Sequence, residues 1–476
     1  MGSSTSSAGN RINSLLDEKS FVEIGSAVTA RATDFNLDPA ATPSDGVITG
    51  YGTIDGNRVY VYSQDASVLG GSIGEMHAKK ICNIYDLAMK TGTPVIGLID
   101  STGVRLQEAT DALNALGEIF FKTAMAKGVV PQITAVFGNC GGGLALVPAM
   151  TDFVFMESKD AKLFVNAPDT LDGNYTAKCD TSSAKFQSEE AGNVDFVGDS
   201  DTILAQIRAL VSMLPQNNDD VAIADSSDDL NRIVPEILGA AGDTSILLSN
   251  IADGNDFLEV GAGFAKDMVT GFIRLDGVTV GCVANRNEVI GEDGKVAQKF
   301  DGMMSHEGAE KAADFVYFCD SFGIPILTVT NVKGFKATKC SEKHIAKSVA
   351  ALTEAFANCD VARVNLIVGK AFGSAYVIMN SKAIGADVTI SWPDTQIGTM
   401  DANLAAKIMC DGKDAETVSK AAAEYAALQN NVKSAAARGY VDEIIEPADT
   451  RKYVIGAFEM LFTKRDERPA KKHGTV

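Results

Sequence analysis

Almost continuous apolar runs alternate along this chain with stretches in which apolar residues recur at helical spacing. The runs at 95–99 and 133–137 are typical of strands that are buried on both faces of a sheet. Residues 75–90 keep the spacing of an amphipathic helix. Runs at 47–53 and 58–63 flank an Asp-Gly pair and predict a β-hairpin. Strands that alternate with helices predict a protein of the α/β class.

The second half of the chain repeats this order. Runs on either side of another Asp-Gly pair, within 271–284, predict a second hairpin. A helix at 309–321 and strands at 326–330 and 364–368 follow. Six residues recur with a constant offset of 231 positions: Lys80, Gly92, Pro94, Gly103, Gly138 and Gly142 correspond to Lys311, Gly323, Pro325, Gly334, Gly369 and Gly373. The repeat predicts two related domains, each with its own glycine loop.

The length of the chain agrees with this division. A chain of 476 residues exceeds what one hydrophobic core usually organises. The segment 213–229, rich in Asn, Asp and Ser, is the clearest linker. We therefore predict an N-terminal domain at 1–228 and a C-terminal domain at 229–476, with a helical stretch at 402–437.

Charge and polar residues exclude several classes of function. A net charge of −20 argues against nucleic acid as a partner, because nucleic-acid-binding faces are basic. Eight scattered cysteines without a C-x-x-C pair indicate the reduced thiols of a cytoplasmic protein, and no apolar run is long enough for a membrane span. The four histidines, at positions 77, 306, 344 and 473, lie far apart in the sequence, so we expect no metal site.

The two glycine loops carry the candidate chemistry. They lie at 138–145 and 369–376, each after a buried strand and before an apolar segment that can begin a helix. Amide groups at the start of a helix lack partners within it, and glycine lets a ligand oxygen approach them closely. Such amides stabilise a developing oxyanion. One glycine loop serves tight packing equally well, but two loops in register favour a binding function.

Longer motifs extend along nearly the whole chain. They include Ser63-Gln64-Asp65, Gly70-Gly71-Ser72-Ile73-Gly74-Glu75, Asp100-Ser101-Thr102-Gly103-Val104-Arg105-Leu106-Gln107-Glu108, Thr151-Asp152-Phe153-Val154-Phe155-Met156 and Gly385-Ala386-Asp387-Val388. Together these motifs resemble the carboxyltransferase family of biotin-dependent acyl-CoA carboxylases and decarboxylases. The resemblance implies two tandem crotonase-like ββα-spiral domains, the N-terminal one for acyl-CoA and the C-terminal one for biotin.

The resemblance also implies roles for individual residues. The amides of Gly142 and Gly143 are expected to hold the thioester oxygen of an acyl-CoA enolate. Ser374 and Ala375, flanked by Gly373 and Tyr376, occupy the positions that hold the ureido oxygen of biotin. The CoA phosphates need positive charge, for which Lys79, Lys80 and Arg105, near the first-domain motifs, are the candidates, and Gly103 is a further candidate cofactor-binding residue.

Departures from the family pattern concentrate in the second half. The usual Gly-Gly-Ala-Tyr is Gly373-Ser374-Ala375-Tyr376 here, and Lys333 replaces a proline. Two other classes of function stay open, and the altered second loop motivates the second of them. One is a crotonase-type CoA-thioester hydrolase, for which Glu108 is the candidate base. The other is a non-catalytic assembly subunit.

Direction and partners follow from the family resemblance alone. The chemistry serves decarboxylation, as in the methylmalonyl-CoA decarboxylase alpha subunit, which we favour, and also carboxylation, as in an acetyl- or propionyl-CoA carboxylase beta subunit. Biotin is expected on a separate carrier protein, with a membrane sodium-pump subunit or a biotin carboxylase as a further partner. We expect a cytoplasmic, dimer-based homo-oligomer, peripheral to a membrane complex if the pump is present, with active sites between domains of different protomers.

Overall fold

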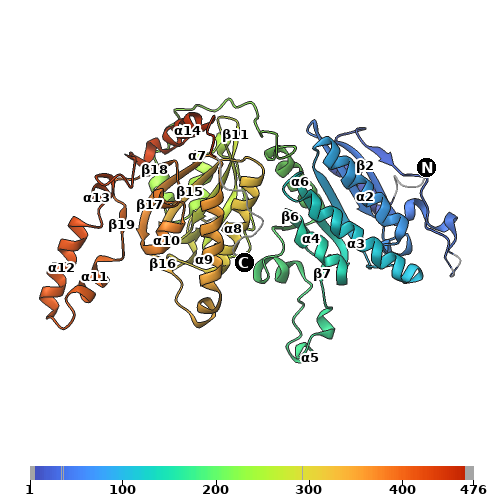
Figure 1. The fold of residues 1–476 in the computed structure, drawn as a ribbon, viewed down its shortest axis with the longest axis horizontal. Coiled ribbons are helices and arrows are strands. Elements are labelled where there is room, and N and C mark those ends of the chain that lie inside the picture. Colours follow the sequence, from blue (N-terminus) through green and yellow to red (C-terminus); the bar gives the residue numbers. More distant parts are fainter. Residues whose placement is uncertain (1–5, 34, 36, 292, 467–476) are drawn as a thin grey trace. The chain divides into compact units, whose positions relative to one another are not determined.

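The computed structural model describes residues 6–33, 35, 37–291 and 293–466 (Figure 1). The chain forms two compact units, Met1–Ala222 and Ile223–Val476. The division falls in the irregular segment after helix α6 (Ser200–Met213), a few residues before the boundary proposed from the sequence.

Unit 1 is built on a mixed sheet that has eight strands within the described residues. The first three strands are antiparallel and the others are parallel. In spatial order they are β1 (Val22–Ile24), β2 (Val47–Ile54), β3 (Asn57–Gln64), β4 (Val95–Ser101), β5 (Gln132–Gly141), β6 (Phe153–Glu157) and β8 (Phe196–Gly198), with β7 (Lys162–Phe164) against the end of β5. The helices are α1 (Ser7–Leu15), α2 (Glu75–Thr91), α3 (Ala109–Ala126), α4 (Leu146–Met150), α5 (Asn174–Ala177) and α6.

Unit 2 repeats this sheet. Its order is β9 (Phe257–Val260), β10 (Met268–Leu275), β11 (Val278–Asn285), β15 (Ile326–Val332), β17 (Arg363–Phe372), β18 (Val388–Ser391) and β20 (Glu443–Ile444), with β19 (Gln396–Gly398) against the end of β17. Two small sheets pair β12 (Glu288–Ile290) with β13 (Val296–Lys299), and β14 (Met303–Met304) with β16 (Gly334–Phe335). The helices are α7 (Thr244–Ile251), α8 (His306–Ser321), α9 (Lys339–Asn358), α10 (Gly373–Ile378), α11 (Ala402–Met409), α12 (Ala415–Leu428), α13 (Val432–Ala436) and α14 (Thr450–Leu461).

The predicted elements are present with extended bounds. Both hairpins turn at an Asp-Gly pair with positive φ at both residues, 49° and 81° in the first and 52° and 76° in the second. These angles are those of the turn that suits the twist of a two-residue hairpin. The helical stretch expected at 402–437 is divided into α11, α12 and α13.

Both units interrupt their central strand pair at the same point. In unit 1 the pairing of β4 with β5 passes from Ile99–Val136 to Ser101–Cys140. In unit 2 the pairing of β15 with β17 passes from Thr330–Ile367 to Val332–Ala371, and each partner lies 231 residues after its counterpart in unit 1. Each bulge places two additional residues in the longer strand. That strand then leaves its first parallel neighbour and pairs with a second one, β7 or β19.

A buried lysine fastens the long helix of each unit to its hairpin. Lys80 on α2 donates hydrogen bonds from Nζ to the carbonyl oxygens of Ser44 and Val47. Its counterpart Lys311 on α8 donates to the carbonyls of Gly261, Phe264 and Met268. Val47 and Met268 begin the equivalent hairpin strands, so the repeat extends to individual contacts.

A segment projects from each unit at the same place in the topology (Figure 1). In unit 1 residues 165–195, which include α5, lie between β7 and β8. In unit 2 residues 399–442, which include α11, α12 and α13, lie between β19 and β20. The main hydrophobic core of each unit lies between its sheet and the helices that cover it, α2 and α3 in unit 1 and α7 and α14 in unit 2. A smaller cluster packs Val432, Ala435 and Val441 of the second projection against β17 and β19. The repeated fold is therefore shared in its core and differs mainly in these two projections.

Candidate active site

The first glycine loop forms a short 3-10 turn, Gly142–Ala145, between β5 and α4. Gly142 has φ +61°, and a side chain there would be strained although no atom lies within 4 Å of its Cβ position. The first amide groups of such a turn have no carbonyl partner within it, and no side chain caps this turn in the described part of the chain. Gly143 is exposed to solvent. The geometry therefore leaves two adjacent amides available to an oxygen atom.

Gly103 lies beside this turn. It has φ +96°, and a Cβ on it would stand 3.7 Å from the carbonyl oxygen of Gly141, the last residue of β5. The carbonyl of Gly103 accepts a hydrogen bond from the amide of Ile73 at 2.8 Å. The structure therefore brings three of the predicted site residues, Gly103, Gly142 and Gly143, to one place.

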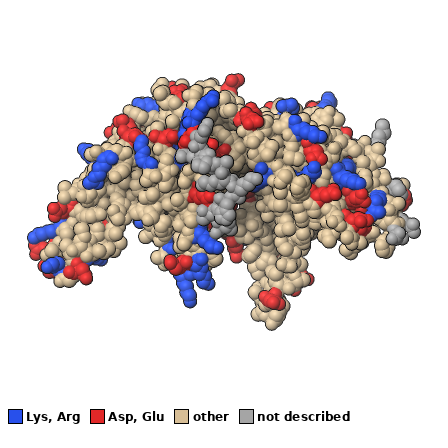
Figure 2. Space-filling model, in the orientation of Figure 1, with Lys and Arg blue, Asp and Glu red and all other residues tan. Residues whose placement is uncertain are grey.

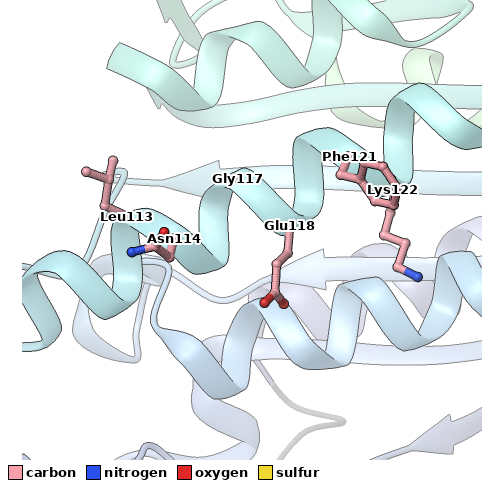
Figure 3. Close-up of a pocket in the computed structure, with 6 residues that line it drawn as sticks. All are labelled: Leu113, Asn114, Gly117, Glu118, Phe121 and Lys122. Carbon is pink, nitrogen blue, oxygen red and sulfur yellow. The ribbon is translucent and has the colours of Figure 1, made fainter.

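Helix α3 forms an apolar wall next to the first turn, which sequence reasoning missed. A Cβ on Gly143 would lie 3.3 Å from Leu116 Cδ2 and 4.0 Å from Phe120 Cζ. The apolar spacing of residues 112–123 could have indicated the helix but not its position. Elsewhere on α3, Leu113 and Phe121 project on one side of a hollow of about 410 Å³, and Glu118 and Lys122 turn toward α2 (Figure 3).

The second loop forms the start of α10 at the end of β17. Gly373 has φ +63°, and a Cβ there would lie 3.3 Å from the carbonyl oxygen of Thr399. No side chain among the described residues caps this helix. Ser374 is exposed, Ala375 is buried and Tyr376 is half-buried. Burial raises the pKa of Tyr376 to about 12, so its hydroxyl stays protonated at neutral pH.

Arg105 is not available to a ligand. Its side chain is fully buried, and Nη1 lies 2.5 Å from Asp45 Oδ1 and 2.8 Å from Glu108 Oε1. Nη2 donates to the carbonyl of Ser72 at 2.7 Å. Burial raises the pKa of Asp45, and the neighbouring guanidinium opposes that shift. Arg105 thus joins three segments of unit 1 and is not placed to bind a CoA phosphate, contrary to the expectation from the sequence.

The two lysines proposed for the CoA phosphates, Lys79 and Lys80, differ in their surroundings. Lys80 is buried against the backbone carbonyls described above, and burial lowers its pKa to about 8. It fastens the fold and has no open path to a phosphate. Lys79 is exposed and forms an ion pair with Glu75 at 2.7 Å, one turn earlier on α2. Of the three cations proposed from the sequence, only Lys79 can reach a ligand.

Glu108 is also engaged within the fold. Its Oε1 receives the Arg105 hydrogen bond, and its Oε2 accepts the amide of Glu75 at 2.7 Å, which caps the start of α2. Both oxygens are committed, so the carboxylate is not poised as a base for thioester hydrolysis.

Two of the histidines meet despite their distance in the sequence. The rings of His306 on α8 and His344 on α9 stack with centroids 5.0 Å apart. Still, no group of three metal-ligating side chains occurs within the described residues.

His77, in unit 1, is buried and neutral. Its Nε2 atom accepts a hydrogen bond from the Gln64 side-chain amide, and its Nδ1 atom donates one to the carbonyl of Asp45. Burial lowers the pKa of His77 to about 3.

Comparison of this chain with known proteins identifies the family in which the loops, the bulges and the repeat occur. Residues 2–476 match the carboxyl transferase domain. The chain belongs to the carboxyl transferase family. This carboxyltransferase is 41% identical to the propionyl-CoA carboxylase beta chain of Roseobacter denitrificans, over 98% of this chain and 93% of that protein. It is 39% identical to the methylmalonyl-CoA decarboxylase subunit alpha of Propionigenium modestum, over 98% and 92% of the two chains.

A solved structure supports the same assignment. Transcarboxylase 12S, with methylmalonyl-coenzyme A and methylmalonic acid bound, matches this carboxyltransferase with a TM-score of 0.90 and 37% identity. The match covers 98% of this chain and 92% of that one. It confirms the predicted architecture of two tandem crotonase-like domains, and the family confirms that the chain is a carboxyltransferase enzyme. Among the helices of the described ranges, none combines the length and the hydropathy that a membrane-spanning helix requires.

Proposed function

We propose that this carboxyltransferase moves a carboxyl group between a short acyl-CoA, of the propionyl or methylmalonyl class, and biotin on a separate carrier protein. The observation that carries the proposal is the pair of amide turns at Gly142 and Gly373, each following an equivalent bulge in an equivalent strand. The relatives named after propionyl-CoA and methylmalonyl-CoA support the size of the acyl group.

The first turn is suited to the acyl-CoA. The amides of Gly142 and Gly143 would donate to the thioester oxygen while negative charge develops on it. Because these donors are fixed by the β5 bulge and by φ +61° at Gly142, they need little reorganisation during the reaction. The apolar side chains of Leu116 and Phe120, next to Gly143, would face the acyl group and exclude water from it.

The second turn is suited to the ureido oxygen of biotin. Biotin on its carrier supplies the ureido nitrogen that bears the transferred carboxyl group. The fit rests on the uncapped start of α10, where the amides of Ser374 and Ala375 follow Gly373. Ser374 is exposed, like Gly143 at the equivalent position of unit 1, so this turn faces solvent as the first one does.

The alternatives receive less support from the geometry. A thioester hydrolase needs a general base, and the oxygens of Glu108 already accept from Arg105 and from the amide of Glu75. A non-catalytic subunit would not need to keep positive φ and an uncapped amide turn in both units.

The experiment is a decarboxylation assay with free biotin. The purified chain is incubated with methylmalonyl-CoA or malonyl-CoA, with and without biotin, and loss of the carboxylated thioester is followed. We expect turnover that requires biotin. Turnover indifferent to biotin, or release of free CoA, would contradict the proposal.

Two variants test whether the reaction takes place at the first amide turn. Gly143→Val places a branched side chain over the first turn and against Leu116, and we expect kcat to fall about 10²–10³-fold, as for loss of one oxyanion donor. Gly117→Ala, on α3 where nothing lies within 4 Å of the Cβ position, is the control and should retain activity.

Direction and assembly belong to the same proposal. Relatives work as carboxylases and as decarboxylases at similar identity, so the pairing of the turns supports either direction. The direction is set by the partner that supplies or removes the carboxyl group: a biotin carboxylase, or a membrane sodium-pump subunit.

We further propose a homo-oligomer in which turns of different protomers face each other, supported by the hexamer assembly of transcarboxylase 12S. Sedimentation of an active monomer would contradict this.

A further inference from the structure

A strongly basic segment interrupts this acidic chain in unit 2. Residues 333–347 contain five lysines, at positions 333, 336, 339, 343 and 347, and one acid, Glu342, which gives a local charge of +4 (5 − 1). All five lysines are exposed. The protein as a whole carries −20, so this segment, which we call the lysine patch, is opposite in charge to the chain as a whole. Figure 2 shows lysine and arginine side chains gathered at the lower edge of unit 2.

The fold does not require these charges. The equivalent segment of unit 1, residues 102–116, contains Arg105, Glu108 and Asp111, with a local charge of −1 (1 − 2). Arg105 is buried there and holds the fold together, whereas its counterpart Lys336 is exposed. In the described residues no acid forms an ion pair with Lys336, Lys339, Lys343 or Lys347.

Three of these lysines lie in the N-terminal half of α9, where their charges slightly destabilise the helix. Lys339 is the first residue of α9, and Lys343 and Lys347 follow at successive intervals of four, on one face. The start of a helix carries a partial positive charge and favours acidic side chains. Like charges four residues apart repel each other as well, at about 0.2–0.5 kcal/mol per pair. Three lysines here therefore disfavour the free helix slightly and are better satisfied by an anionic partner.

The lysine patch borders the second amide turn. Strand β16, at the beginning of the patch, contacts α10, and α9, which carries the later lysines, contacts α10 as well. Lys333 donates to the carbonyl of Asp301 at 2.9 Å, which fixes the loop before β16. From Lys339 to Lys347 the helix rises about 12 Å. A row of this length matches several carboxylates on a protein surface better than it matches one phosphate group.

We propose that the lysine patch is the docking surface for an acidic face of the biotin carrier protein. The inference rests on the proposed function, which assigns the second turn to biotin. A carrier whose acidic face lies on α9 would present its biotin beside Gly373. Long-range attraction between the two faces would raise the association rate, and salt would weaken it.

The test compares two carboxyl acceptors. Free biotin reaches the second turn without docking, whereas biotinylated carrier protein, purified from the source organism, needs the surface. The variant is Lys339→Glu, Lys343→Glu and Lys347→Glu combined. The acid at 339 suits the helix dipole, and three like charges at one spacing replace three others, so we expect little change in folding, which circular dichroism checks. The control, Lys90→Glu, Lys159→Glu and Lys185→Glu, changes the net charge equally at exposed positions of unit 1.

We expect kcat/KM for the carrier to fall about tenfold or more in the α9 variant, with little change for free biotin and little change in the control. Salt should weaken binding of the carrier to the immobilised wild-type chain but not to the α9 variant. Equal carrier kinetics in variant and control would overturn the proposal. So would a raised KM for acyl-CoA with free biotin, which would assign the lysines to CoA phosphates. Absence of biotin-dependent turnover in the wild type would refute the proposed function, while the binding measurement would still decide the docking surface.

Discussion

Replacing Arg105 by methionine should destabilise unit 1 and leave its ligand affinity intact. The guanidinium lies between the fully buried carboxylates of Asp45 and Glu108 and also holds the carbonyl of Ser72. Methionine keeps much of the volume but leaves two buried acids without their cation. Breaking a buried charge pair in this way costs about 3–5 kcal/mol.

The expected change in thermal stability follows from that energy. For a unit of this size, 1 kcal/mol corresponds to about 2–4 °C, so the Tm of unit 1 should fall by about 6–20 °C. The loss should shrink as the pH is lowered. Without Arg105 the pKa of Asp45, already raised by burial, rises further, and the protonated acid is cheaper to bury.

The assay is thermal unfolding followed by circular dichroism at pH 5 and pH 8, together with KM for acyl-CoA. Lys336→Met is the matched control, because Lys336 occupies the equivalent position in unit 2 but is exposed; it should change Tm little. The reasoning is refuted if Arg105→Met leaves Tm unchanged and raises KM, since Arg105 would then act on the ligand and not on the fold.

Three further outcomes follow from the geometry of unit 1. Burial holds the pKa of His77 at about 3, below its unfolded value of 6.5. The neutral ring therefore contributes its full share to the free energy of unfolding above pH 6.5, and this share falls between pH 6.5 and pH 3, by about 2 kcal/mol at pH 5. His77→Gln should make Tm less dependent on pH in this range. Ala109 begins α3 with φ +45° and ψ −119°, a region suited to glycine, so Ala109→Gly should raise Tm by relieving about 1 kcal/mol of strain, and a lowered Tm would contradict this. Gly138→Ala should abolish activity and lower Tm because its Cβ would collide with the Asp100 carboxylate, whereas Gly117→Ala has open space and should not.

The sequence determined the repeat, the fold class and the position of both glycine loops. These features are local: apolar runs specify buried strands, an Asp-Gly pair specifies the hairpin turn, and glycine permits positive φ at Gly142 and Gly373. Each can be recognised within a few residues, and the constant offset of 231 reinforced every one of them. The lysines of 333–347 were equally visible in the sequence.

The fate of the charged residues was decided only by the tertiary structure. Lys79 and Lys80 are neighbours, yet one is exposed and the other is buried beneath the carbonyls of Ser44 and Val47, because α2 turns successive side chains in different directions. Arg105 is buried because Asp45, 60 residues earlier, meets it in space.

The meeting of His306 with His344, and the place of the lysines beside the second turn, depend in the same way on the packing of α8, α9 and α10. A pattern of residue types records which side chains prefer burial or solvent. Whether an ionisable group receives a buried partner depends on segments that are distant in the sequence, and only the assembled fold brings those partners together.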